Sequence, residues 1–335
     1  MIEMTAHDAA SLLDTTIERE IQIFDDYTNL SGSAYCSIKK VAPFIMRIRP
    51  REVRQKTKTL GIIAITHGNE VLGLPIVNRL IGEILAGKIM PATKILFAAG
   101  NVPSARAGKR FIDRDLNRSF ALNSNENAET VRAREIETHF FDRCDYVLDL
   151  HQTIQPSHSP FFFFYYFSQR QFDFLNAVNP GLPVIVTLND ALHGQNGQTT
   201  NEYLKNQGKV CLTVELGEKG FFADKFDLGL TIAKKMIATV QNAEQTIEPM
   251  ANPERLLKIE VGYRVQHSGT RLDEGWRNLQ EVVKGQRLGH SDGGPIHSPI
   301  SGYILFPKYA PDPAIGQELF CICKQIEPRE LLNDG

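Results

Sequence analysis

The sequence predicts an α/β fold with a mostly parallel central sheet, followed by a small C-terminal β domain. An apolar run at residues 61–66, a helical pattern at 71–86 and a second apolar run at 94–100 form a strand-helix-strand order, which is typical of parallel pairing. The last quarter of the chain instead has short alternating segments between glycines and prolines, as in a barrel or sandwich. We therefore expect domains at residues 1–248 and 249–335.

The remaining elements follow from periodicity and composition. Residues 1–30 mix acidic and apolar positions and predict a helix or a covering strand. Further expected elements are one or two strands at 34–49, a long polar loop at 101–120, a helix at 127–144, a buried aromatic strand at 160–167, a loop leading into a helix near 202–204, a helix at 228–243, a proline-containing linker at 246–253, and strands at 257–265, 281–283, 302–306 and 318–323.

Composition excludes several classes of function. The 335 residues carry a net charge of −2 without a block of lysine and arginine, which argues against nucleic acid as a partner. No apolar run reaches the length of a membrane span, and acidic residues interrupt the first thirty positions, so no signal peptide is expected. Five cysteines without Cys-x-x-Cys spacing fit a reducing cytoplasm. Whether the chain forms a homo-oligomer is left open.

Metal-competent side chains stand at the ends of apolar runs. His67 and Glu70 follow the run at 61–66, with a Gly-Asn turn between them, and His151 ends a second run that begins at Tyr146. Ligands of open α/β sheets bind beyond the carboxyl ends of the strands, so we expect these ends to converge. Two imidazoles and one carboxylate form the ligand set of a catalytic zinc that keeps one position for water, and one zinc ion per chain is predicted.

Each of these residues also has a structural explanation. A His-x-x-Asp/Glu spacing arises by chance about once in a chain of this composition, and a single histidine such as His151 is more often a core residue. Asp149 shares a strand face with His151 and can orient its ring from behind, but a strand-end cap explains it equally. The similar design of the strands favours the metal site.

Glu215 is the candidate general base. It ends a third apolar run, which begins at Val210, and a carboxylate at that place can take a proton from water and pass it to a leaving amine. The alternative is a buried carboxylate paired with an arginine.

The polar loop supplies the candidate substrate contacts. Arg110 and Arg118 present planar forks that suit a substrate carboxylate, and Asn117 can help to hold the substrate or to polarise its scissile carbonyl. The other cations of the loop are expected to be solvated: Arg106, Lys109 and Arg114.

Four motifs together resemble the succinylglutamate desuccinylase and aspartoacylase family. They are Thr-His-Gly-Asn-Glu at 66–70, Lys-Arg-Phe-Ile-Asp-Arg-Asp-Leu-Asn-Arg-Ser-Phe at 109–120, Asp-Leu-His-Gln-Thr at 149–153 and Val-Glu-Leu-Gly at 214–217. The resemblance implies a zinc-carboxypeptidase-like domain, a C-terminal β domain that narrows the site entrance, and hydrolysis of an N-acyl acidic amino acid. By position, it implies zinc ligation by His67, Glu70 and His151, a base at Glu215, and substrate contacts from Arg110, Asn117 and Arg118.

The resemblance also bears on the substrate. Aspartoacylases carry a Tyr-x-x-x-Arg pair before the catalytic glutamate, whereas residues 198–203 contain no arginine, and Tyr309 only loosely matches their substrate-contacting tyrosine. The Thr-Val-Glu-Leu-Gly sequence around Glu215 is closer to that of the desuccinylases. N-succinylglutamate, cleaved to succinate and glutamate, is therefore the expected substrate. The alternatives are an aspartoacylase-type deacylase of N-acetylaspartate, a carboxypeptidase-type metallopeptidase, and a metal-bearing binding protein without turnover.

Overall fold

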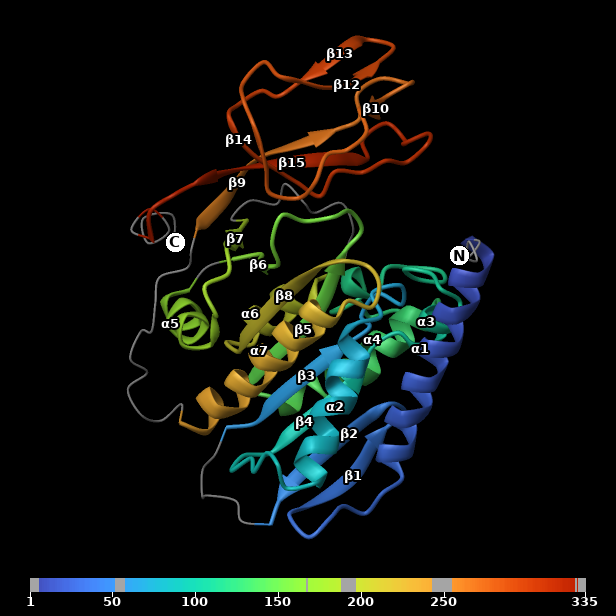
Figure 1. Ribbon diagram of the computed structural model, residues 1–335, viewed down its shortest axis with the longest axis vertical. Helices are drawn as coiled ribbons and strands as arrows, with labels where there is room; N and C mark the ends of the chain where they lie inside the picture. Colours follow the sequence, from blue (N-terminus) through green and yellow to red (C-terminus); the bar gives the residue numbers. More distant parts are fainter. Residues whose placement is uncertain are drawn as a thin grey trace, which may run out of the picture. The chain divides into compact units, whose positions relative to one another are not determined.

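The computed structural model describes residues 6–51, 58–166, 168–187, 197–242, 255–328 and 330, with side chains from residue 16. The chain divides into two compact units (Figure 1). The first contains residues 1–151, 195–213 and 220–248, and the second contains 152–194, 214–219 and 249–335. The α/β class is confirmed. The expected linker at 246–253 lies outside the described residues, and the two-domain division at 248/249 stays a prediction.

A mixed sheet runs through the first unit in the order β1-β2-β4-β3-β5. The strands are β1 (Cys36–Ala42), β2 (Ile45–Pro50), β3 (Leu60–Ala64), β4 (Ile95–Ala99) and β5 (Tyr146–Thr153). β3 pairs in parallel with both β4 and β5, as the strand-helix-strand pattern predicted. The expectation of a mostly parallel sheet is wrong for β1 and β2, which pair antiparallel. Only two residues join them, and so short a connection permits no parallel pairing.

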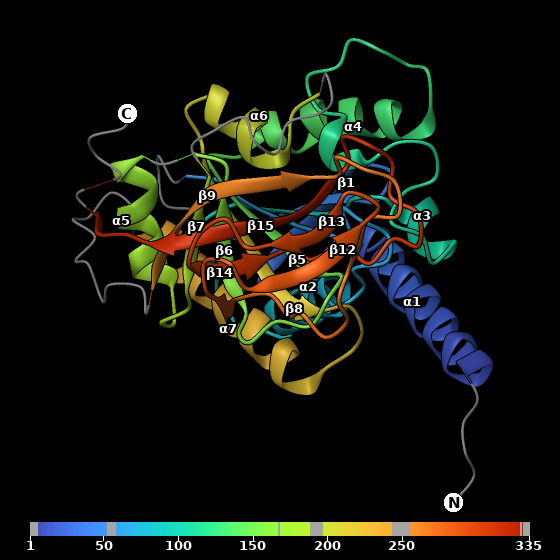
Figure 2. The ribbon, with the colours of Figure 1, turned by 90° about the horizontal axis from the view of Figure 1, so that it is seen from above.

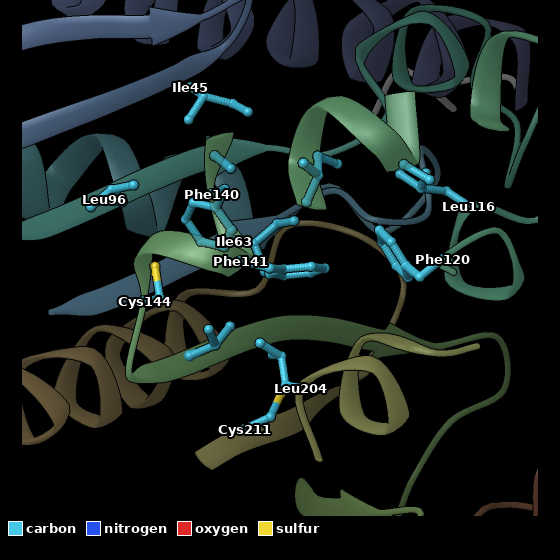
Figure 3. Close-up of a cluster of buried hydrophobic side chains, with 14 residues drawn as sticks. Ile45, Ile63, Leu96, Leu116, Phe120, Phe140, Phe141, Cys144, Leu204 and Cys211 are labelled. Atoms are coloured by element: carbon cyan, nitrogen blue, oxygen red, sulfur yellow. The ribbon is translucent and has the colours of Figure 1, made fainter. Parts of the chain in front are cut away.

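Helices cover both faces of this sheet. They are α1 (Ala6–Thr28), α2 (Gly73–Leu85), α4 (Ala128–His139), α6 (Thr200–Asn206), α7 (Ala223–Gln241) and the short 3-10 helix η2 (Phe141–Arg143). Figure 1 shows α2 and α7 on one face, and α1 packs against α2 (Figures 1 and 2). On the other face, α4, η2 and α6 enclose an apolar cluster that includes Ile63, Leu96 and Phe140 (Figure 3). The predicted helices are confirmed, and none in the described parts of the chain is long and apolar enough to cross a membrane.

The second unit consists mostly of strands. They are β6 (Phe161–Phe164), β7 (Val184–Val186), β9 (Leu256–Arg264), β15 (Glu318–Gln325), β14 (Gly302–Leu305) and β11 (Gln280–Val282), in that order, and a separate sheet of β10 (Arg271–Leu272), β12 (Arg287–Ser291) and β13 (Gly294–His297). β9, β15 and β14 lie side by side in Figure 2. The unit also holds helix α5 (Gln169–Val178), while β8 (Val210–Glu218) contributes residues to both units. Of the aromatic run predicted as a buried strand at 160–167, residues 161–164 form a fully buried strand, and Tyr165 just after it is only partly buried.

The segment at 101–120 is more ordered than its polar composition predicted. It contains α3 (Val102–Arg106), whose first turn is capped by Asn101, and the 3-10 turn η1 (Leu116–Arg118). Leu116 and Phe120 are fully buried in the apolar cluster of Figure 3. Leu116 and Phe120 therefore hold this segment against the protein core. Its many charged residues had predicted an open loop instead.

Candidate active site

The site begins where β3 ends. Ile65 takes a left-handed backbone with a φ of 51°, which is rare for a β-branched residue. The backbone amides of Gly100 and Asn101 hold this bend by donating to the carbonyls of Ala64 and Ile65, both at 2.8 Å. The bend directs the following residues, including His67, past the carboxyl end of the strand. Such local strain is typical of functional sites.

Three side chains converge beyond this bend. His67 Nδ1 lies 2.7 Å from Glu70 Oε1, and His151 Nδ1 lies 2.8 Å from Glu70 Oε2. One ligand atom from each residue can be chosen so that all lie within 4.8 Å of one another, and all three residues are buried. The structure thus brings together the three residues that the sequence assigned to a metal.

The outer nitrogen of each imidazole faces a second carboxylate. His67 Nε2 lies 3.1 Å from Asp115 Oδ1, and His151 Nε2 lies 3.0 Å from Asp149 Oδ2. Thr66 donates its hydroxyl to the other oxygen of Asp149, at 3.1 Å. A carboxylate behind a ligating histidine fixes the orientation and tautomer of the ring. The placement of Asp149 agrees with its predicted orienting position. Asp115, in the motif at 109–120, has the equivalent place beside His67, which no sequence pattern indicated.

Charge accumulates in this buried cluster. Burial alone raises the pKa of Glu70 and Asp115, but the neighbouring histidines, joined at Asp115 by Arg110, lower both pKa values below their usual range. Burial lowers the pKa of His151, and the carboxylates of Asp149 and Glu70 reverse this and raise that pKa well above its usual value. The carboxylates thus favour positive charge at the point where the imidazoles meet.

Arg110 binds two carboxylates of this site, those of Glu70 and Asp115. Its guanidinium donates to Glu70 Oε1 at 3.1 Å and to Asp115 Oδ2 at 3.1 and 3.2 Å, and Nη2 lies 2.7 Å from His67 Nε2. Its backbone carbonyl accepts the Gly68 amide at 3.0 Å. The side chain is nevertheless 31% exposed, so part of the guanidinium remains accessible. Arg110 is therefore held beside the candidate metal ligands and not extended into solvent.

The other loop residues have more structural contacts than the sequence suggested. Asn117 is buried, and its Oδ1 accepts the backbone amide of Thr200 at 2.8 Å. Arg118 donates to the carbonyl of Asn117 at 2.7 Å. The expectation of a solvated Arg114 is wrong, because its guanidinium donates to the Arg118 carbonyl at 3.1 and 3.3 Å. Lys109 is exposed as expected, and the exposed Arg106 pairs with Glu18. The substrate roles of Arg110, Asn117 and Arg118 stay predictions.

The structure also describes Glu215, Tyr309 and Tyr203. Glu215 is half-buried on β8, in the part of that strand that belongs to the second unit, and its role as a base stays a prediction. The Tyr309 hydroxyl accepts the backbone amide of Trp276 at 2.7 Å, which is a structural contact within the second unit. Tyr203 donates to Asp142 at 3.2 Å and packs on Phe141. The ring of Tyr203 therefore packs against the apolar cluster, while its hydroxyl is bound to Asp142.

We expect Gly68→Ala to distort the site. A Cβ at this position would lie 2.3 Å from the backbone of Ser104 and Ala105, which cannot move aside as a flexible side chain does. Such overpacking costs about 1–3 kcal/mol of stability, measurable by denaturant unfolding. The control is Gly82→Ala on α2, whose Cβ would meet only the hydroxyl of Tyr27 at 3.0 Å. Equal stabilities of the two variants would contradict this close approach.

Asp149→Asn is expected to weaken metal binding about 10–100-fold without abolishing it. The amide keeps the shape of the carboxylate but removes the charge that lies 3.0 Å from His151 Nε2. A competitive chelator titration measures the affinity. Asp142→Asn is the control, since the side chain of Asp142 accepts from Tyr203 and Gln207 and, within the described residues, has no contact with the candidate ligands. An unchanged affinity in Asp149→Asn would mean that the carboxylate does not act on the ligand.

Comparison with protein families gives a match over the catalytic region. Residues 56–247, more than half of the chain, match the model of the succinylglutamate desuccinylase/aspartoacylase catalytic domain. A succinylglutamate desuccinylase of Pseudomonas aeruginosa (strain LESB58) is 26% identical over 321 residues, which covers 89% of this chain and 93% of that protein. One from Pseudoalteromonas atlantica is 26% identical over 309 residues, covering 84% and 85%.

Solved structures show the same fold. A succinylglutamate desuccinylase from Vibrio parahaemolyticus superposes with a TM-score of 0.72 at 20% identity and covers 91% of this chain and 95% of its own. Murine aminoacylase 3 superposes with a TM-score of 0.59 at 17% identity, covering 82% and 97%. The family match includes all three converging residues, His67, Glu70 and His151, together with Glu215. This chain belongs to the succinylglutamate desuccinylase/aspartoacylase family.

Proposed function

We propose that the protein is a zinc-dependent amidohydrolase that cleaves the amide bond of an N-acyl acidic amino acid, with N-succinylglutamate as the preferred substrate and succinate and glutamate as products. The observation that carries the proposal is the buried group of His67, Glu70 and His151. The names of the relatives support the substrate, since those with high coverage are succinylglutamate desuccinylases.

The donor atoms fit a zinc ion. His67 Nδ1 is buried and has no aligned hydrogen-bond partner among the described residues, although Glu70 Oε1 lies 2.7 Å away. A ring nitrogen and a carboxylate oxygen that lie this close in a buried place are arranged for a common cation. Two imidazoles and one carboxylate are also the donor set of catalytic zinc sites. When bound, zinc polarises a carbonyl oxygen and lowers the pKa of a coordinated water.

The protein's own residues supply the remaining steps. In this proposal, Glu215 accepts a proton from the attacking water and delivers it to the leaving amine. Arg110 and Arg118 bind negative charge on the substrate, and Asn117 holds the turn that carries Arg118. Arg110 is suited to this because Glu70 and Asp115 fix its guanidinium while 31% of the side chain stays exposed. The carboxypeptidase-like character of the domain, the narrowing role of residues 249–335 and the cytoplasmic location remain part of the proposal.

A substrate panel tests the function. The zinc-loaded protein is incubated with N-succinylglutamate, N-succinylaspartate, N-acetylglutamate, N-acetylaspartate and a dipeptide with a C-terminal glutamate, and the free amine is assayed. We expect kcat/KM to be highest for N-succinylglutamate. Preference for N-acetylaspartate would support the aspartoacylase alternative, and cleavage of the dipeptide would support a carboxypeptidase. Binding without release of amine from any compound would refute an enzyme of this class.

A further inference from the structure

A buried carboxylate outside the proposed catalytic group contacts the segment that carries Arg110. Glu129 stands in the first turn of α4 and is 1% exposed. Its Oε1 accepts the backbone amide of Ile112 at 2.7 Å and the side-chain amide of Asn101 at 3.2 Å, and its Oε2 accepts the backbone amide of Asp113 at 3.3 Å. A single side chain thus binds two consecutive amides just after Arg110.

Glu129 is not needed to cap its own helix. Asn127 and Thr130 form a reciprocal capping box, in which each side chain accepts the backbone amide of the other residue. The carboxylate is therefore free to accept donors from outside α4, at the end of the helix where its dipole favours negative charge. A buried carboxylate with three donors is a rigid anchor, because losing a partner leaves a buried donor without an acceptor.

The same helix also holds the other end of the segment. Arg132, one turn further along α4, donates to the carbonyls of Ala99 and Gly100, both at 2.8 Å. Asn101, which Glu129 binds, caps α3 through its side chain. The segment from the end of β4 to Asp113 is thus bound by α4 at both ends, and Arg110 lies within it.

We propose that Glu129 is a positioning residue for the reaction: it anchors the amides of Ile112 and Asp113 and thereby sets the guanidinium of Arg110 against Glu70 and Asp115. This inference rests on the proposed function for its kinetic consequence, but its geometric part can be tested separately. Glu129 touches neither the proposed ligands nor, in the proposal, the substrate. Its effect passes through Arg110.

The test is Glu129→Gln. Glutamine has one acceptor oxygen where the carboxylate has two, so its NH2 group must face at least one of the three donors. The matched control is Glu137→Gln on the same helix. Within the described residues, the one backbone amide that Glu137 accepts is that of Ala121, through Oε1, and a glutamine can keep that bond. The same substitution is therefore expected to disrupt one anchor and preserve the other.

The first measurement does not depend on activity. Phenylglyoxal labelling of arginines, read by peptide mass spectrometry, reports how firmly Arg110 is held. We expect labelling of Arg110 to rise several-fold in Glu129→Gln and to stay at the parent level in Glu137→Gln. Arg79 on α2, which is 57% exposed, pairs with Glu83 and lies outside the anchored segment, serves as the internal reference. Unchanged labelling of Arg110 in a folded Glu129→Gln protein overturns the inference.

The second measurement is a double-mutant cycle on kcat/KM with N-succinylglutamate. Glu129→Gln is expected to lower kcat/KM by tens of fold in the parent, with zinc content retained, and by less than about threefold in an Arg110→Ala background. Equal losses in both backgrounds overturn the positioning role. If the Gln variant does not fold, Glu129→Asp, which keeps the charge, replaces it. Should the parent hydrolyse nothing while the labelling change occurs, the proposed function fails and the anchoring of Arg110 stands.

Discussion

Replacing His67 or His151 with alanine is expected to abolish stoichiometric zinc binding and the hydrolysis that depends on it. Each histidine is one of three buried candidate ligands, and its ring nitrogen lies within 2.8 Å of a Glu70 oxygen. With only two ligands left, the loss should exceed the roughly 10–100-fold that removing a partner behind a ligand costs. Metal analysis after dialysis measures the zinc content directly.

A stability measurement adds an independent readout for these variants. Zinc that binds the folded protein only stabilises it, by about 2.7 kcal/mol when the free ion is a hundredfold above its dissociation constant. Added zinc should therefore raise the melting temperature of the parent and leave that of His67→Ala and His151→Ala unchanged. The control is His290→Ala, whose side chain is 54% exposed on β12. Parent-like zinc content in both ligand variants would refute the assignment.

Local patterns in the sequence predicted the parts of the site that strands deliver. His67 and Glu70 follow β3, and His151 lies on β5, the parallel neighbour of β3. An apolar run marks where such a strand ends, and parallel pairing brings neighbouring ends to one edge. The three residues could therefore be grouped from sequence before any contact between them was known.

The residues behind these ligands could not be predicted in the same way. Asp115 contacts the imidazole of His67, and Glu129 contacts the backbone amide of Ile112. Asp115 and Ile112 both lie in a segment without apolar periodicity, so no pattern indicates these contacts. The sequence gives one indication for Asp115: it belongs to the motif at 109–120 and stands five positions after Arg110, with which it pairs. The prediction of a solvated Arg114 is wrong for the same reason, because its partner is the backbone carbonyl of Arg118, which is placed only when η1 forms.

The sequence pattern also did not predict the direction of β1 relative to β2 or the presence of very short strands. β1 and β2 are antiparallel because a two-residue turn joins them, while the composition of either strand would suit both directions. β10 has only two residues and β7 three, which is too short for alternation to be recognised. The longer C-terminal strands, such as β9 and β15, gave clear signals and were predicted close to their observed bounds.

Glu215→Gln is expected to give the opposite signature to that of the ligand variants: zinc is retained, and kcat falls by about 10²–10⁴, the usual contribution of a positioned general base. Glutamine keeps the volume and polarity of the half-buried glutamate on β8 but cannot accept the proton from water. Metal analysis and steady-state kinetics on the same preparation separate the two effects.

Two further variants make this result specific to the proton transfer. Glu218→Gln changes a second half-buried glutamate of β8, whose backbone carbonyl, and not its side chain, accepts from Gln152, so near-parental kcat is expected. Glu215→Asp keeps a carboxylate but withdraws it by one methylene, so it should recover part of the activity that the Gln variant loses, because a base must lie within hydrogen-bond reach of its proton. If a zinc-replete Glu215→Gln protein turned over at the parental rate, another group would have to accept the proton, and the proposed mechanism would lose its base.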